Sequence, residues 1–114
     1  MKISTRLALT FASGGISSGV ETFNEMHKAI THVLGWDVFT HELAAASVWQ
    51  QAKENVHAVS EPLKRFGEEL RDNRPLWGIA EVEAKIDELF ARCIAEVGEF
   101  VDIPKGSGEC RAFQ

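Results

Sequence analysis

Apolar residues along most of the chain recur every three or four positions, which is the spacing of one helix face. The clearest series spans positions 79–100 and predicts a helix of about six turns. A second series spans positions 20–34 and predicts a helix that ends at Gly35, with Ser18 and Glu21 forming a capping box at its start. The two series are Ile79, Val82, Ile86, Leu89, Cys93, Val97 and Phe100, and Val20, Phe23, Met26, Ile30, Val33 and Leu34.

Two further helices are predicted between these two series, because residues that favour helix starts occur at two points there. Thr40 is expected to cap a third helix that reaches about Val59. Ser60 is expected to cap a fourth, with Pro62 in its first turn, where the missing N–H leaves no helical bond unmade. The segment "RDNRP", residues 71–75, reads as the clearest loop. The inner faces of these helices are Val48, Trp49, Ala52, Val56 and Val59, and Leu63, Phe66 and Leu70.

Three shorter segments complete the pattern. The apolar positions near residues 4–13 fit both helical spacing and strand alternation. We interpret this segment as a short helix, with Ser4 as its cap and glycines 14–15 as its end. The segments "WDVF", residues 36–39, and "EFVDIP", residues 99–104, have the composition of very short strands that could pair with each other.

These elements predict a mostly α fold. We expect a compact single-domain bundle of about five helices, with one very short β pair. The helical domain should comprise residues 1–104, and residues 105–114, rich in glycine, should form a flexible tail. The residues expected to share one core are Phe23, Ile30, Phe39, Trp49, Phe66, Ile86, Leu89 and Cys93.

The composition suits one globular domain without a membrane span. The chain has 114 residues, of which 45% are hydrophobic and 25% charged, and this size favours one domain with one core. The formal net charge is −5. Direct binding to nucleic acid needs a clustered basic face, so this charge argues against it. No apolar run approaches the ~18 residues of a membrane helix. We expect a cytoplasmic protein whose apolar start belongs to the mature domain, with a signal peptide as the alternative.

Acidic residues concentrate in the second half of the chain. Residues 61–102 carry eleven acidic and six basic side chains, a balance of −5, against five and four, a balance of −1, in residues 1–60. A solvated pair of helices explains this without any function. The alternative is an acidic face that docks on a basic protein surface, with Trp77 as its buried aromatic anchor. The acidic residues of this candidate face are Glu68, Glu69, Asp72, Glu81, Glu83, Asp87 and Glu88.

No group of side chains completes a catalytic or metal site in the sequence. His27 and His32 are five positions apart, whereas metal-binding pairs on a helix prefer a spacing of four. Cys93 and Cys110 lack the spacing of a zinc site, and two free thiols are favoured over a disulfide. His41 has no catalytic partner nearby in sequence. We therefore expect no enzyme, metal or cofactor, with a small enzyme using His41 as an alternative.

One stretch resembles an uncharacterised family of small phage and prophage proteins. Residues 19–44, "GVETFNEMHKAITHVLGWDVFTHELA", are similar to that family's central pattern of a helix, a glycine and a Phe-Thr-His-x-Leu run. Trp77 and the ending "VGEFVDIP", residues 97–104, also fit the family. Ala44 stands where the family often has proline, and residues 45–74 do not align. The motif residues, to which we assign structural roles, are Gly35, Phe39, Thr40, His41 and Leu43.

The resemblance implies a phage or mobile-element origin and no established activity. We expect a non-enzymatic binding protein that inhibits a host defence complex, of the anti-CRISPR type, by occupying a protein surface. Its partner would be a host protein or nucleoprotein complex with a basic surface, bound by a monomer or a homodimer. The alternative is a structural or regulatory phage accessory protein, a homodimer without an inhibitory role.

Overall fold

The computed structural model describes residues 1–16 and 22–110. Of these residues 68% are helical, and the expected mostly α single-domain bundle with a short β pair is confirmed. In chain order the described elements are β1 Lys2–Ser4, α1 Thr5–Ala12, α2 Phe23–Leu34, the 3₁₀ helix η1 Thr40–Ala44, α3 Ala46–Val59, α4 Glu61–Asn73, the 3₁₀ helix η2 Arg74–Leu76, α5 Val82–Val97 and β2 Phe100–Asp102.

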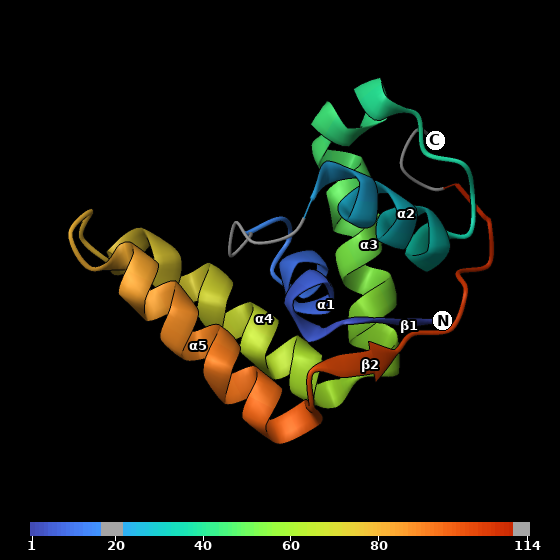
Figure 1. The fold of residues 1–114 in the computed structure, drawn as a ribbon. Coiled ribbons are helices and arrows are strands. Elements are labelled where there is room, and N and C mark those ends of the chain that lie inside the picture. The colour runs from blue at the N-terminus through green and yellow to red at the C-terminus, as the bar shows by residue number, and fades with distance from the viewer. Residues whose placement is uncertain (17–21, 111–114) are drawn as a thin grey trace.

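Helix α1 lies at the centre of the molecule. In Figure 1 it stands between α2 and α3 on one side and α4 and α5 on the other, and it contacts all four. Every residue of α1 except Arg6 is buried. A helix that is buried on nearly all sides has no polar stripe, which explains why its sequence fits two patterns. As predicted, the side chains of Ser4 and Ser60 cap α1 and α4.

The β pair joins the two ends of the described chain. Strand β1 pairs antiparallel with β2, so residues 99–104 do contain a strand. The expected partner for it, residues 36–39, was wrong, because these residues form no strand. Gly35 turns the chain there with a φ of 81°. Val38 is buried, and its carbonyl oxygen accepts a hydrogen bond from His27 Nε2 at 2.5 Å, so it is not offered to a neighbouring strand.

Helix α2 starts with a capping box at Thr22. The Thr22 hydroxyl accepts from the backbone N–H of Glu25 at 3.2 Å, and the Glu25 carboxylate accepts from the backbone N–H of Thr22 at 3.3 Å. The predicted box of Ser18 and Glu21 lies outside the described residues.

The prediction that Thr40 caps a long third helix was wrong. Thr40 begins the separate 3₁₀ helix η1, and α3 starts only at Ala46. The start of η1 is held by Glu42, whose carboxylate accepts from the backbone N–H of Phe39 at 2.7 Å. Helix α3 itself follows Ala45 and has no side-chain cap, so no hydroxyl plays the role expected of Thr40.

Helix α4 continues through most of the segment predicted as a loop, residues 71–75. The Asn73 side chain donates to a backbone carbonyl one turn earlier at 2.7 Å, which keeps it inside the helix. Pro75 lies in the first turn of η2, where it costs no helical hydrogen bond. The chain reverses only over residues 77–81, so Ile79 lies in the turn and not in α5.

The predicted core is partly confirmed. Ile30, Phe66, Leu89 and Cys93 are buried, and Trp49 and Ile86 are half-buried against the same core. For Phe23 and Phe39 the prediction was wrong, because they are 51% and 64% exposed. Phe23 is the first residue of α2 and stacks on His27, and Phe39 immediately precedes η1 and stacks on His41. Both lie at an element's start, outside its inner face.

Residues 105–109, expected to be part of a flexible tail, cross the C-terminal end of α2. The backbone N–H groups of Gly106 and Gly108 donate to the carbonyl oxygens of His32 at 3.0 Å and Leu34 at 3.2 Å. They satisfy carbonyl groups that a helix end leaves without intrahelical donors. A Cβ at Gly106 would overlap the backbone of α2, so the close approach requires glycine.

Candidate functional site

Helices α4 and α5 form a hairpin that projects from the rest of the molecule. In Figure 1 the two helices run side by side, and η2 with the following turn forms the far tip at the left of the view. Their inner faces meet α1 near the base, where Phe66, Leu89 and Cys93 are buried. The hairpin therefore presents its tip on a support that is anchored in the core.

The tip carries large exposed apolar side chains. Leu76 is 77% exposed and Ile79 is 98% exposed. The turn is held by Gly78, whose backbone N–H donates to the Glu81 carboxylate at 3.0 Å. Trp77, predicted as the anchor of a docking face, is half-buried and packs against the core. The apolar tip that faces solvent is thus formed by Leu76 and Ile79.

Sequence reasoning missed this tip because Ile79 continues the apolar spacing of the last helix. That spacing assigned Ile79 to the buried face. Pro75 and Gly78, which come shortly before Ile79, are residues that favour turns. Their presence could have placed Ile79 in a turn instead.

The seam between α4 and α5 is closed by charged pairs over one aromatic ring. Arg92 lies 3.0 Å from the Glu69 carboxylate, and Arg65 lies 2.6 Å from that of Glu96. Both guanidinium groups also lie over the Phe66 ring, at 5.6 and 5.1 Å from its centroid. The hydrogen bond that Arg92 donates to the Glu69 carboxylate raises the pKa of Arg92 above its ordinary value. These pairs link the two helices across the seam, although exposed ion pairs add little to stability.

Three of the seven predicted acidic docking residues have roles within the hairpin. Glu69 pairs with Arg92 across the seam. Glu88 lines a seam cavity of about 200 Å³ that Arg92 and Trp77 also line. Glu81 holds the turn at the tip.

The other four acidic residues are exposed on different flanks. Glu68 and Asp72 lie one turn apart on α4, and Glu83 and Asp87 one turn apart on α5. At about 100° per residue, Glu83 and Asp87 face away from the flank that carries Glu88. The acidic residues therefore surround the hairpin and do not converge on one face.

The motif residues of the Phe-Thr-His-x-Leu run lie just before the start of α3, at the top of Figure 1 and away from this tip. His41 is exposed, and its ring stacks on Phe39 with centroids 5.9 Å apart. Among the described residues no hydrogen bond engages the His41 ring. Leu43 is half-buried, and its carbonyl oxygen accepts from the indole N–H of Trp49 at 2.8 Å.

The other three histidines join distant segments through their rings. His27 Nε2 lies 2.5 Å from the carbonyl oxygen of Val38, His32 Nε2 lies 2.7 Å from that of Ile103, and His57 Nε2 lies 2.7 Å from that of Ala12. A carbonyl oxygen only accepts hydrogen bonds, so Nε2 carries the proton in each case. These contacts are structural and were not apparent from the sequence.

Neither cysteine forms a disulfide, as the sequence favoured. Cys93 is fully buried, and desolvation raises the pKa of its thiol to about 11. A thiol held in this state is a poor nucleophile, because the thiolate is the reactive form. In the part of the chain that the structure describes, no cluster of histidine, cysteine or acidic side chains is placed to hold a metal ion. No helix of residues 1–16 or 22–110 has the length and apolarity to cross a membrane.

Comparisons with known proteins give no indication of function for this chain. No protein-family model matches the chain, and no curated protein or solved structure matches it.

Proposed function

We propose that this chain is a non-enzymatic binding protein that docks on a partner protein through the tip of the α4–α5 hairpin. The observation that carries the proposal is the exposure of Ile79 at 98% and Leu76 at 77% on a projecting tip. Contiguous exposed apolar surface marks protein interaction sites, whereas single exposed apolar side chains are common. Covering these side chains with a partner removes apolar surface from water, which favours binding.

The charge of the hairpin as a whole favours a basic partner. Residues 61–97 carry nine acidic and six basic side chains, a balance of −3, although Asp72 and Glu83 near the tip are matched there by the exposed Arg74 and Lys85. This acidic balance would steer the hairpin toward a basic surface and would mainly affect the association rate. The apolar tip would then enter a pocket and hold most of the affinity.

The proposed partner is a host protein or nucleoprotein complex whose basic surface contains an apolar pocket. A surface that normally holds nucleic acid has this basic character. The resemblance of residues 39–43 to phage and prophage proteins makes a host defence complex the concrete candidate, with inhibition of the anti-CRISPR type by occupation of the surface. Such inhibition requires shape and charge and no reaction centre.

A site-specific crosslinking experiment tests the proposal. A photo-reactive amino acid replaces Ile79 in one variant and Val59, which is 47% exposed on α3, in a matched control. After irradiation in host cell extract, we expect position 79 to crosslink one defined host protein that position 59 does not reach. Purification of that protein then allows direct binding measurements.

Three results would contradict the proposal. Crosslinks from position 79 to a second copy of this chain alone would favour the homodimeric accessory protein. Equal crosslinking of the same host protein from positions 79 and 59 would remove the tip as the site. Turnover of a substrate that is lost on His41→Ala, with the fold unchanged, would favour the enzyme instead.

A further inference from the structure

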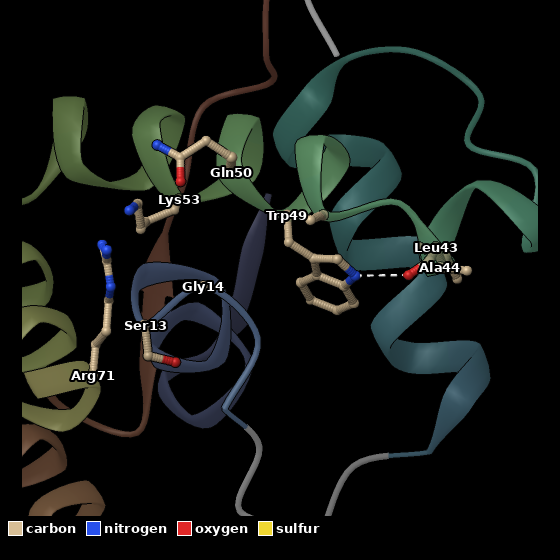
Figure 2. A pocket seen from close by; sticks show the side chains of 9 residues that line it. Ser13, Gly14, Leu43, Ala44, Trp49, Gln50, Lys53 and Arg71 are labelled. Atoms are coloured by element: carbon tan, nitrogen blue, oxygen red, sulfur yellow. Dashed lines mark hydrogen bonds between the residues drawn. The ribbon is translucent and has the colours of Figure 1, made fainter. Parts of the chain in front are cut away.

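A second candidate site lies on the other side of α4 from the seam. A cavity of about 500 Å³ opens between the end of α1, the segment around η1 and helices α3 and α4 (Figure 2). This volume is in the range of small-molecule sites. The lining residues that carry the argument are Ser13, Gly14, Leu43, Trp49, Lys53 and Arg71.

The cavity is positively charged. Lys53 on α3 and Arg71 on α4 both line it, and no acidic residue is among the described residues of its lining. Figure 2 shows the two side chains at the same end of the cavity. Neither takes part in any of the ion pairs between described residues. The site therefore offers two cationic groups that are not neutralised within it.

Lys53 is the more unusual of the two cations. Its side chain is only 8% exposed, although lysine is almost never buried unless it is paired. Its hydrocarbon stem passes beside Gly14, where a Cβ would lie 3.8 Å from the Lys53 Cδ atom. The stem packs on the end of α1, and the ammonium group is left at the cavity. The described residues that line the cavity offer this ammonium group no acidic partner, and an anionic ligand would supply one.

The opposite end of the cavity is apolar. Trp49 and Leu43 line it, and in Figure 2 the indole lies across Gly14 from the two cations. The Trp49 ring is held in place, because its N–H donates to the Leu43 carbonyl oxygen at 2.8 Å. The ring also packs against Phe11, with centroids 6.1 Å apart. The aromatic wall is thus fixed before any ligand arrives.

We infer that this cavity binds a small phosphate monoester whose organic part is apolar or aromatic. Two cations match the charge of about −1.5 to −2 that a phosphate monoester carries near neutral pH, and a carboxylate would neutralise only one of them. Arg71 suits the multiple oxygens of a phosphate group, with Lys53 as a point charge beside it. The organic part would lie against Trp49 and Leu43.

Isothermal titration calorimetry of the full chain tests this inference, with phenyl phosphate as the probe. Inorganic phosphate and benzoate separate the anionic and aromatic contributions. We expect phenyl phosphate to bind more tightly than either. Lys53→Met and Arg71→Met should each weaken it roughly tenfold or more, because a charge-assisted contact contributes ~1.5–3 kcal/mol. The controls Lys64→Met and Arg74→Met remove exposed charges that do not line the cavity and should leave binding unchanged.

Nuclear magnetic resonance locates the binding. The indole N–H signal of Trp49 should shift on addition of phenyl phosphate, and that of Trp77 in the hairpin should not. Because Arg71 is exposed, Arg71→Met keeps the test decisive even if Lys53→Met fails to fold. Three results would overturn the inference: no binding at millimolar phenyl phosphate, binding that ignores Arg71→Met, or equal affinity for benzoate.

Discussion

Gly67 in α4 packs directly on the carbonyl group of Ala12 at the end of α1. A Cβ at position 67 would overlap the Ala12 carbonyl oxygen and would lie 2.8 Å from the Ala12 Cβ. This contact lets α4 approach the central helix closely enough for Leu63, Phe66 and Leu70 to be buried. A glycine inside a helix normally destabilises it relative to alanine by about 1 kcal/mol, so the close packing here has to outweigh that cost.

Gly67→Ala should therefore destabilise the protein although alanine is the better helix former. Overpacking of this kind costs roughly 1–3 kcal/mol or more, and chemical denaturation measures it. Gly78→Ala is the control, because the nearest atom to a Cβ there is 3.9 Å away. Unchanged or increased stability of Gly67→Ala would show that α1 and α4 are not packed this closely.

Two leucines on the hairpin should respond very differently to the same truncation. Leu89 is 2% exposed and Leu76 is 77% exposed. Leu89→Ala should lower the free energy of unfolding by roughly 2–5 kcal/mol, whereas Leu76→Ala should change it by less than about 0.5 kcal/mol. Denaturation of both variants under the same conditions gives the comparison. Similar losses in the two would mean that the tip packs against the core.

The thiol of Cys93 should make stability depend on pH in the alkaline range. Its pKa rises from the ordinary value of 9.0 to about 11 on folding. Between these values the unfolded chain loses the proton first, so stability should fall as pH rises from about 9 toward 11. The stabilising effect of the raised pKa is fully present below about 9. Denaturation of wild type and Cys93→Ala at pH 8, 9 and 10 isolates this contribution, and parallel pH profiles would contradict it.

His32 and His41 should differ in their importance for folding. His32→Ala removes the shorter of two hydrogen bonds to the Ile103 carbonyl oxygen, which keeps a 3.5 Å contact from the Met1 ammonium group, and the loss of such a bond costs roughly 0.5–1.5 kcal/mol. His41→Ala removes an exposed ring stacked on Phe39 and should cost less than about 0.5 kcal/mol. Thermal unfolding compares the two. A larger loss for His41→Ala would reverse these assignments.

The elements predicted well from the sequence were those whose signals are local. Ser4 and Ser60 each accept a hydrogen bond from the backbone three residues ahead, so the sequence alone marks these helix starts. The buried positions of α4 and the middle of α5 also repeat at helical spacing. Such features depend on the period of the helix and need no knowledge of the fold.

The features that sequence reasoning missed depend on contacts between distant segments. β2 pairs with β1 and not with residues 36–39, where Val38 is buried and its carbonyl oxygen bonds to His27. The rings of His27 and His32 bond to carbonyl oxygens that helical spacing cannot locate. Lys53 reads as a solvated helix residue, yet it is buried because α1 packs beside α3.

The most direct test of the proposed docking site is the affinity of this chain for the host protein that crosslinks to position 79. Its dissociation constant should be measured for wild type, for Leu76→Ser with Ile79→Ser, and for the control Val59→Ser. Loss of the tip should weaken binding by about 30-fold or more, as expected for an anchor that contributes ~2 kcal/mol or more, while Val59→Ser should bind as wild type does. An unchanged dissociation constant for the folded double variant would contradict the proposal that this tip is the docking site.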